Sequence, residues 1–339
     1  MKRRLLLLVA WGSLLAAAGC GPAQREGDAA AEHGVSPAAE TTYRIAVIPK
    51  GTSHQFWKSV HAGARRAAKE LGHVEIIWKG PQKENDTAGQ IEVVKSYITK
   101  RVDAICLAPN HSEALVDVVL EANDEGIPVV IFDSGLGQGA QIVSYVATDN
   151  YAGGELAADR VAELLEGQGS AIMLRYRAGS ESTGQREAGF LERLEKKYPD
   201  VKILSADQFG EESAESAFKA VNQLLIKYGQ EVDALFAVCE PNCNGTLEAL
   251  EQAGLAGKVK FVAFDPSEVL IRGMETGKVH GIVLQDPVNM GYQAVKAAVA
   301  KVQGRPVRDR IPTGEYLATP ENMREEKYDT LLHPVMHED

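Results

Sequence analysis

The chain has 339 residues, with 36 Lys and Arg against 47 Asp and Glu, and its formal net charge at pH 7 is −11. This acidic balance argues against nucleic acid as a partner, because nucleic-acid binding needs basic patches that displace counterions from the phosphates. Of the four cysteines, the three that lie beyond residue 20 (Cys106, Cys239 and Cys243) are not a disulfide framework. A chain of this length can bury two modest cores.

The N-terminus has the layout of a secretory signal. A basic start, KRR, precedes an apolar run from Leu5 to Ala18, which is shorter than the ~20 apolar residues that span a bilayer. The run ends in AAGC, which resembles a bacterial lipobox with Ala17 in place of the usual Leu. The resemblance predicts a signal peptide over 1–19 and lipidation of Cys20, and hence a location in the periplasm or cell envelope. The alternative is ordinary cleavage after Ala18, which would release a secreted protein.

Residues 20–41 are predicted to be a flexible tether. They are rich in Gly, Pro, Ala, Glu, Gln and Ser and have almost no large apolar side chains, so they cannot bury enough surface to offset the entropy of ordering. Removal of residues 1–19 takes away three basic side chains and changes the net charge from −11 to −14.

The rest of the chain alternates between short apolar, β-rich runs and amphipathic stretches that are typical of helices. Continuous apolar runs indicate strands that are buried on both faces, as in a parallel sheet covered by helices. Ten such runs are too many for one small domain, so we expect two doubly wound α/β lobes. The runs are 43–48, 74–78, 104–108, 129–132, 142–147, 171–176, 202–206, 234–238, 259–264 and 280–285.

Polar residues and a few aromatic residues directly follow these runs. Ligands of open parallel sheets bind just beyond the carboxyl ends of the strands, so these positions are the candidate site. Carboxylates, amides and guanidinium groups hydrogen-bond to hydroxyls, while aromatic rings cover apolar C–H faces. The combination indicates a small polyhydroxylated ligand.

Segments in this order resemble the periplasmic binding proteins of sugar ABC importers, of the ribose/galactose/xylose type with the Type I fold. They include YRIAVIPKGTSHQFW, IPVVIFDSG, STGQREAGF and VHGIVLQDPVNMGYQAV, and the resemblance runs from Tyr43 to about Thr319. It implies two lobes joined by a three-segment hinge, with the ligand bound between them. The implied boundaries are 42–146 with 287–312 for the N-terminal lobe and 147–286 with 313–339 for the C-terminal lobe.

The resemblance also implies ligand contacts at particular positions. Phe56 and Trp57 match the aromatic pair that stacks on the sugar, although a helix-start core pair is the alternative for one of them. Asp133 and Asp265 match the two strand-end aspartates, for which local turn capping is the alternative. The remaining matches are Arg186, in the helix containing TGQREAGF, and Gln285, near the hinge.

Other positions depart from the family pattern. Ser134 stands where ribose binders have Arg, and His54 replaces an amide near the aromatic pair, so the ligand is expected to differ from ribose. Cys239 occupies the place of a usual Asn, and Glu240 or Asn242 could take over its role; we include His54 and Asn242 among the candidate ligand residues.

A disulfide between Cys239 and Cys243 and a pair of buried thiols are both consistent with the sequence. No metal site is expected there, because no further ligands have suitable spacing.

The sequence does not predict an enzyme. It has no HExxH, GxSxG or P-loop motif, and the glycines between Gly135 and Gly139 lack the last glycine and the following helix of a dinucleotide-binding fingerprint. No cofactor is therefore expected.

Two functions remain open. One is capture of a monosaccharide or related small polar molecule and delivery to an ABC permease in the inner membrane. The other is a receptor of the same fold that signals to a membrane histidine kinase or chemoreceptor.

Overall fold

The computed structural model describes residues 42–334. The predicted signal peptide over 1–19, the lipidation site Cys20 and the predicted tether over 20–41 lie outside the described residues. Within the described part, no helix is long and apolar enough to cross a bilayer.

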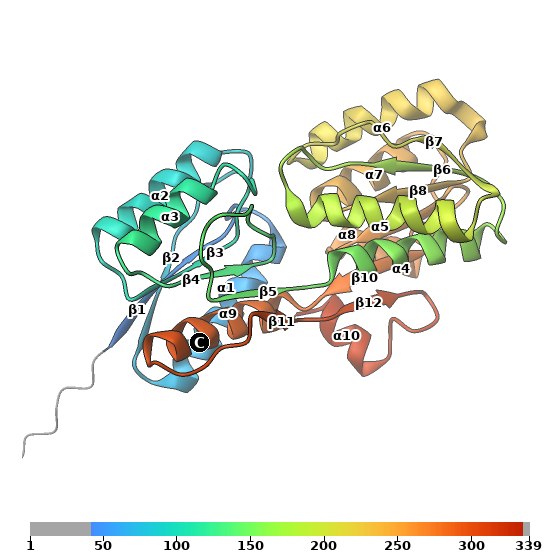
Figure 1. Cartoon of the computed structure of the whole chain (residues 1–339). Helices are drawn as coiled ribbons and strands as arrows, with labels where there is room; N and C mark the ends of the chain where they lie inside the picture. Colours follow the sequence, from blue (N-terminus) through green and yellow to red (C-terminus); the bar gives the residue numbers. More distant parts are fainter. Residues whose placement is uncertain (1–41, 335–339) are drawn as a thin grey trace, which may run out of the picture. The chain divides into compact units, whose positions relative to one another are not determined.

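Strands and helices alternate along most of this part of the chain (Figure 1). The strands are β1 (Tyr43–Ile48), β2 (Val74–Trp78), β3 (Ala104–Leu107), β4 (Val129–Phe132), β5 (Ser144–Ala147), β6 (Gly169–Leu174), β7 (Val201–Ser205), β8 (Ala234–Ala237), β9 (Lys260–Phe264), β10 (Gly281–Gln285), β11 (Arg310–Pro312) and β12 (Glu315–Ala318). The helices are α1 (Gln55–Leu71), α2 (Thr87–Thr99), α3 (Val116–Asp124), α4 (Asn150–Leu164), α5 (Glu181–Lys197), α6 (Ala214–Tyr228), the 3₁₀ helix η1 (Gly229–Glu231), α7 (Glu240–Gln252), α8 (Glu268–Glu275), α9 (Pro287–Val302) and α10 (Glu326–Leu332).

The strands form two six-stranded sheets. The first has the order β11-β5-β4-β3-β1-β2, and all its pairings are parallel. The second has the order β12-β10-β9-β8-β6-β7 and is parallel except for its edge strand β12. The strand order reverses beside β1 in one sheet and beside β6 in the other, as in doubly wound folds.

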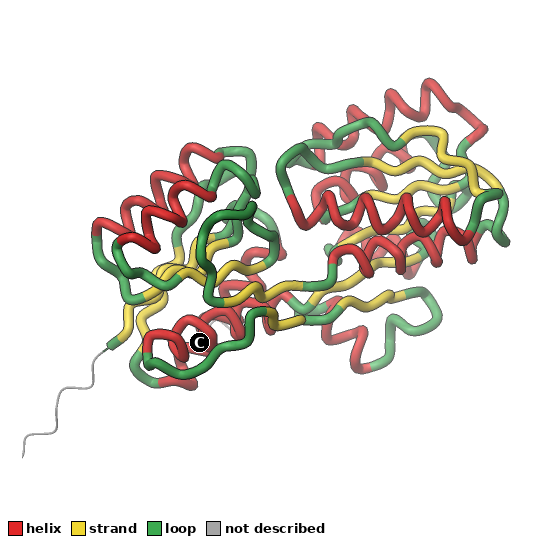
Figure 2. The backbone as a smooth tube through the Cα atoms, in the orientation of Figure 1, coloured by secondary structure: helices red, strands yellow, loops and turns green. Residues whose placement is uncertain are grey.

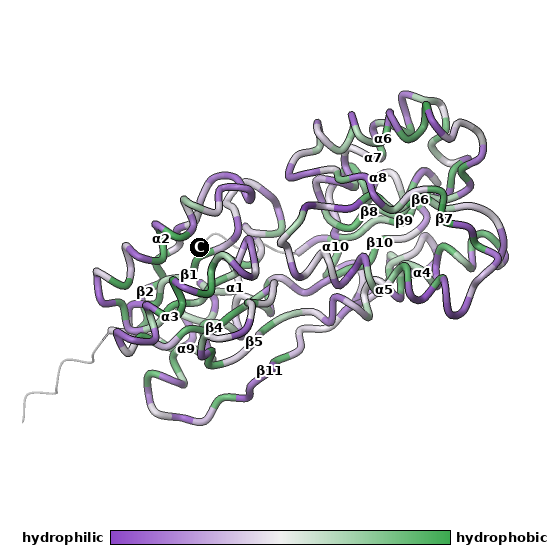
Figure 3. The backbone as a smooth tube through the Cα atoms, turned by 45° about the horizontal axis from the view of Figure 1, so that its top comes forward, coloured by the Kyte–Doolittle hydropathy of each residue, from purple (hydrophilic) through white to green (hydrophobic). Residues whose placement is uncertain are grey.

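Helices cover both faces of each sheet (Figure 2). In the first lobe, α1 and α9 enclose a core on one face and α2 and α3 enclose a core on the other. In the second lobe, α4 and α5 cover one face, and α6, α7, α8 and α10 cover the other. Burial on both faces explains the continuous apolar runs of inner strands such as β4 and β8, which are mostly hydrophobic in Figure 3.

Three short segments connect the two sheets. The chain passes from β5 to α4, returns from β10 to α9, and passes again from β11 to β12. Asp149 and Asp286 cap the helices that follow the first two crossings, accepting from Ala152 N and Asn289 N.

Close packing of α4 on α5 fixes the position of a buried arginine. A Cβ on Gly154 would clash with the carbonyl oxygen of Arg186, and one on Gly189 would clash with that of Tyr151. These two glycines therefore let the helices approach closely, which holds Arg186 beneath the strand ends of the second sheet.

Candidate functional site

A small cavity lies where the carboxyl ends of strands from both sheets meet. Its volume is about 40 Å³, which is room for about one water molecule. The residues that line it come from both lobes and are mostly polar or aromatic. They are Lys50, His54, Phe56, Trp57, Glu84, Asp133, Tyr176, Ser182, Thr183, Arg186, Cys239, Glu240, Pro241, Asp265 and Gln285.

A buried ion pair marks the first lobe's side of the cavity. Lys50 follows β1 and Asp133 follows β4, and Lys50 Nζ lies 2.9 Å from Asp133 Oδ2. Lys50 also donates to the hydroxyl of Ser182, 2.9 Å away at the start of α5 in the second lobe. The lysine thus joins a carboxylate of one lobe to a hydroxyl of the other.

Glu84, in the loop between β2 and α2, is the centre of a hydrogen-bond network. Its carboxylate accepts from Trp57 Nε1 at 2.6 Å and from the hydroxyl of Tyr176 in the second lobe at 2.7 Å, and it lies 2.8 Å from His54 Nδ1. Burial raises the pKa of Glu84, but the bond to His54, the charges of His54 and Lys50 and the bond from Trp57 outweigh burial and lower that pKa from 4.5 to about 2.

The pKa of His54 is raised from 6.5. Burial by itself would lower this pKa, but the hydrogen bond to Glu84 and the negative charges of Glu84 and Glu240 outweigh burial. Glu84 is therefore an ionised carboxylate whose partners come from both lobes.

Arg186 and Asp265 form the second lobe's buried ion pair, with 3.5 Å between Nη1 and Oδ2. Arg186 also donates to Asn150 Oδ1 and to the carbonyl of Val238, both at 2.9 Å, and its guanidinium lies 3.7 Å from the ring centroid of Phe264. Burial raises the pKa of Asp265, which the charge of Arg186 and the bond from Gln285 only partly offset.

Asp133 and Asp265 share an uncommon backbone conformation. Each directly follows a buried strand, and their φ angles are 62° and 66°, in the left-handed region. Residues with side chains rarely adopt this region, although Asp and Asn do so more readily than most. The same strained geometry at corresponding strand ends of the two lobes aims two carboxylates at one cavity and indicates a functional role.

Direct hydrogen bonds hold the lobes together around the cavity. The Ser182 backbone N–H donates to the hydroxyl of Ser134, and the Gly135 N–H donates to the carboxylate of Glu181 at 2.8 Å. Arg177 donates to the carbonyl oxygen of Glu84 at 2.7 Å. With about 40 Å³ between them, the lobes are closed in this conformation, so a sugar-sized ligand needs them to separate before it can enter.

Seven of the eight predicted ligand residues line this cavity: His54, Phe56, Trp57, Asp133, Arg186, Asp265 and Gln285. Trp57 also belongs to the hydrophobic core of the first lobe, and only its Nε1 meets the polar network. Asn242 is not brought to the cavity: it is fully buried, and its amide donates to the carbonyl oxygen of Glu211. Cys239 lines the cavity, and Cys239 and Cys243 are free, buried thiols whose pKa values burial raises.

Sequence reasoning did not single out several residues of the site: Lys50, Glu84, Tyr176, Ser182 and Thr183. Lys50 and Glu84 stand in the strand-end loops that the sequence marks as a candidate region. Nothing in a single sequence distinguishes them from Lys79, Lys83 or Asp86 in the same type of loop.

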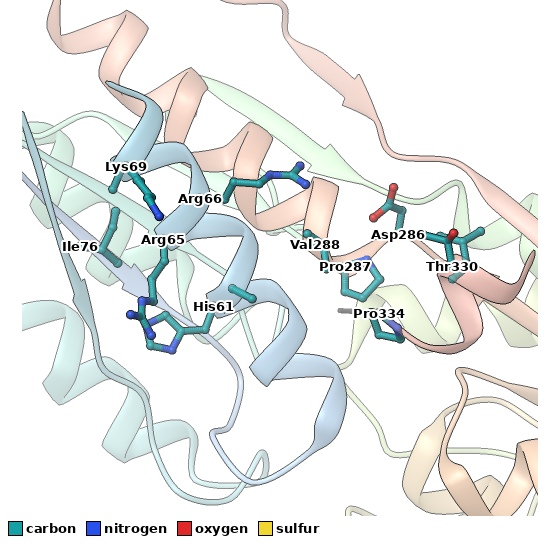
Figure 4. A pocket seen from close by; sticks show the side chains of 13 residues that line it. His61, Arg65, Arg66, Lys69, Ile76, Asp286, Pro287, Val288, Thr330 and Pro334 are labelled. Carbon is teal, nitrogen blue, oxygen red and sulfur yellow. The ribbon is translucent and has the colours of Figure 1, made fainter. Parts of the chain in front are cut away.

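A larger cavity of about 840 Å³ lies away from this site, against α1, the start of α9 and the C-terminal segment (Figure 4). Arg65, Arg66 and Lys69 contribute cationic side chains to it. None of the predicted ligand residues lines this larger cavity. The residues that directly follow β6, β8 and β9 in the second lobe do not line it either. We therefore assign the candidate site to the smaller cavity.

The fold and the site define a two-lobed α/β binding protein, with a ligand cleft between doubly wound lobes. Residues 45–306 match the family described as periplasmic binding protein domain, and the chain belongs to this family. The fold class predicted from the sequence and the resemblance to periplasmic sugar-binding proteins are both confirmed.

Individual relatives agree with this assignment. The ribose import binding protein RbsB of Haemophilus influenzae is 28% identical over 82% of this chain and 92% of its own length. A crystal structure of a periplasmic component of a sugar transport system from Hahella chejuensis is 35% identical, with a TM-score of 0.77, and covers 81% of this chain and 99% of its own.

A carbohydrate transporter solute-binding protein from Agrobacterium radiobacter, solved in complex with D-arabinose, is 31% identical, with a TM-score of 0.82, and covers 87% of this chain and 100% of its own. These relatives are binding proteins and not enzymes, as the sequence predicts for this chain.

Proposed function

We propose that the protein is an extracytoplasmic solute-binding lipoprotein that captures a sugar between its lobes and delivers it to an ABC permease. The observation that carries the proposal is the pair of left-handed aspartates, Asp133 and Asp265, which meet at one cavity from opposite lobes. Sugar hydroxyls can donate to both carboxylates, and such charge-assisted hydrogen bonds are the strong ones. The related ribose import binding protein and the related solute-binding protein in complex with D-arabinose support a sugar as ligand.

Closure follows from the same geometry. A ligand that contacts Asp133 in one lobe and Asp265 in the other binds the closed state better than the open one and shifts the population toward it. The closed protein is then the form that a permease would recognise.

Asp133→Asn and Asp265→Asn should each weaken sugar binding by roughly 10- to 100-fold, since a hydrogen bond to a charged group contributes about 1.5–3 kcal/mol. Asn tolerates the left-handed backbone, but each change leaves a buried cation, Lys50 or Arg186, without its partner charge, so the affinity is to be expressed per folded molecule. Calorimetric titration with ribose, arabinose, allose, galactose and xylose would measure the affinities, and the intrinsic tryptophan fluorescence, to which Trp57 at the cavity contributes, would report binding independently.

Asp149→Asn is the matched control for this experiment, because Asp149 caps α4 and does not line the cavity. Its affinity and melting temperature should stay unchanged, since Asn is an equally good cap. The proposal fails if none of these sugars binds, or if both cavity variants bind as tightly as the wild type.

Anchoring is tested separately. Cys20→Ala should move the protein from the membrane fraction to the soluble fraction and leave its sugar affinity unchanged, because every residue that lines the cavity belongs to the described part of the chain, residues 42–334. Fractionation followed by immunoblotting measures this. Unaltered membrane association of the variant would contradict the lipoprotein assignment.

A further inference from the structure

Two helices that begin at the small cavity are not capped by their own N-cap residues. In α1 and α5, which both lie in the described part of the chain, the side chains of His54 and Ser180 make no capping bond to their own helix. Other helices are capped locally, because the side chains of Asp149, Ser213 and Asp286 accept from backbone N–H groups of α4, α6 and α9. The first N–H groups of a helix have no partner within the helix, so the starts of α1 and α5 need acceptors from the opposite lobe or from water.

The opposite lobe provides these acceptors. In α5 of the second lobe, the N–H of Ser182, the second residue of the helix, donates to the hydroxyl of Ser134 in the first lobe at 3.1 Å. In α1 of the first lobe, the N–H of Phe56, again the second residue, donates to the carboxylate of Glu240 in the second lobe at 3.3 Å. An N-cap side chain usually accepts at this position, so each lobe caps a helix of the other.

The start of α5 makes further bonds to the first lobe. The hydroxyl of Ser180, which would be the local cap, accepts from Lys50 Nζ at 3.4 Å. The carboxylate of Glu181 accepts from the Gly135 N–H at 2.8 Å and from the Tyr145 hydroxyl at 3.3 Å. All these bonds cross between the lobes, so they form when the lobes close and break when the lobes separate.

Ser134 takes part in this arrangement without being a ligand residue. It is fully buried, and it is not among the residues that line the small cavity. A change at Ser134 therefore alters the balance between open and closed lobes and leaves the lining of the cavity in place. Ser134 is also a position at which the sequence departs from ribose binders, which have Arg there.

We propose that Ser134 and Glu240 are positioning residues that couple closure of the lobes to capping of α5 and α1. When the lobes separate, the N–H groups of Ser182 and Phe56 lose these acceptors and bond to water instead. Closure therefore gains two hydrogen bonds that the ligand does not make. This inference rests on the proposed function, because a larger closed population raises the apparent affinity for a sugar held between the lobes.

Ser134→Ala tests the coupling, and Ser213→Ala is its matched control, because Ser213 caps α6 within one lobe. Calorimetry with ribose, arabinose, allose, galactose and xylose measures the affinities, and stopped-flow tryptophan fluorescence measures the dissociation rate of the sugar that binds most tightly. Ser134→Ala should bind about two- to tenfold more weakly, which is the effect of one net hydrogen bond, and the sugar should dissociate faster by a similar factor. Ser213→Ala should lower the melting temperature and leave affinity and dissociation rate unchanged.

Amide hydrogen exchange gives a readout that a purely structural role would not change. In the wild type, the sugar should slow exchange at the N–H groups of both Ser182 and Phe56. In Ser134→Ala it should still slow exchange at Phe56 but have at least threefold less effect at Ser182, and Glu240→Ala should show the reverse pattern. The Glu240→Ala arm also tests the coupling if Ser134→Ala does not fold.

The outcomes separate this inference from the proposed function. If Ser134→Ala binds and releases the sugar as the wild type does, or if the sugar slows exchange at Ser182 equally in both, only this inference fails. If no sugar binds to the wild type, the proposed function fails, and exchange in the free protein then decides the inference. Exchange at Ser182 should be at least threefold faster in free Ser134→Ala than in free Ser213→Ala, and equal rates would contradict the trans-lobe cap.

Discussion

Arg186→Ala should destabilise the protein by about 3–5 kcal/mol and abolish measurable sugar binding. Arg186 is 2% exposed, and its side chain pairs with Asp265 and donates to Asn150 and to the Val238 carbonyl. Its removal leaves a carboxylate buried without a compensating charge, which is the costly way to break a buried ion pair. Denaturant unfolding measures the stability, and calorimetry measures the binding.

Two further variants show whether the charge pair is the cause. Arg193→Ala, on the same helix, should destabilise the protein far less than Arg186→Ala, because Arg193 pairs with Asp159 at a partly exposed site where solvent screens the charges. The double variant Arg186→Ala with Asp265→Asn should be more stable than Arg186→Ala alone, because the unpaired charge is removed as well. If the free-energy change of the double variant equals the sum of the changes in the two single variants, then the ion pair is not the reason why Arg186 stabilises the protein.

Most of the fold could be predicted from the sequence because the strands of a doubly wound sheet are buried on both faces. Runs such as 104–108 and 129–132 are apolar throughout and contain β3 and β4, which are fully buried. The short strand β11, with the sequence RIP, is exposed at the sheet edge, so its residues carry no comparable pattern. Position-by-position resemblance located Asp133 and Asp265, whose loops follow such strands directly.

The rest of the site could not be predicted for a physical reason. Glu84 lies in KGPQKENDT, together with three other charged residues. Contacts with residues far away in the sequence distinguish it, namely those with His54, Trp57 and Tyr176. Asn242 illustrates the opposite case, because it follows a strand end but turns toward the Glu211 carbonyl. Long-range packing decides which loop side chains reach the cavity, and a single sequence does not contain that information in readable form.

Glu84→Gln should destabilise the closed protein most strongly near pH 5.5. The pKa of Glu84 in the folded state is about 2, against 4.5 ordinarily, so its contribution is present above pH 4.5 and is lost as the pH falls toward 2. The pKa of His54 is raised above 6.5, so its contribution is present below pH 6.5 and is lost as the pH rises through the raised pKa. The pair therefore stabilises the protein fully only between these limits.

In the Glu84→Gln variant the carboxylate is absent, and burial then lowers the pKa of His54, so charging this histidine becomes unfavourable. The melting temperature of the variant should fall below that of the wild type by the largest margin near pH 5.5, and the margin should shrink toward pH 3 and pH 8.

Tyr176→Phe is the comparison for this prediction. It removes the 2.7 Å hydrogen bond from the Tyr176 hydroxyl to Glu84, and it keeps the contacts of Glu84 with His54 and Trp57. Tyr176 does not titrate in this range, since burial raises its pKa well above 10. Its loss should therefore lower the melting temperature by a similar amount at pH 3, 5.5 and 8. If the melting-temperature difference between Glu84→Gln and the wild type is also the same at all three pH values, folding does not change the protonation of His54 and Glu84. Glu84 then acts only as a hydrogen-bond acceptor between the lobes.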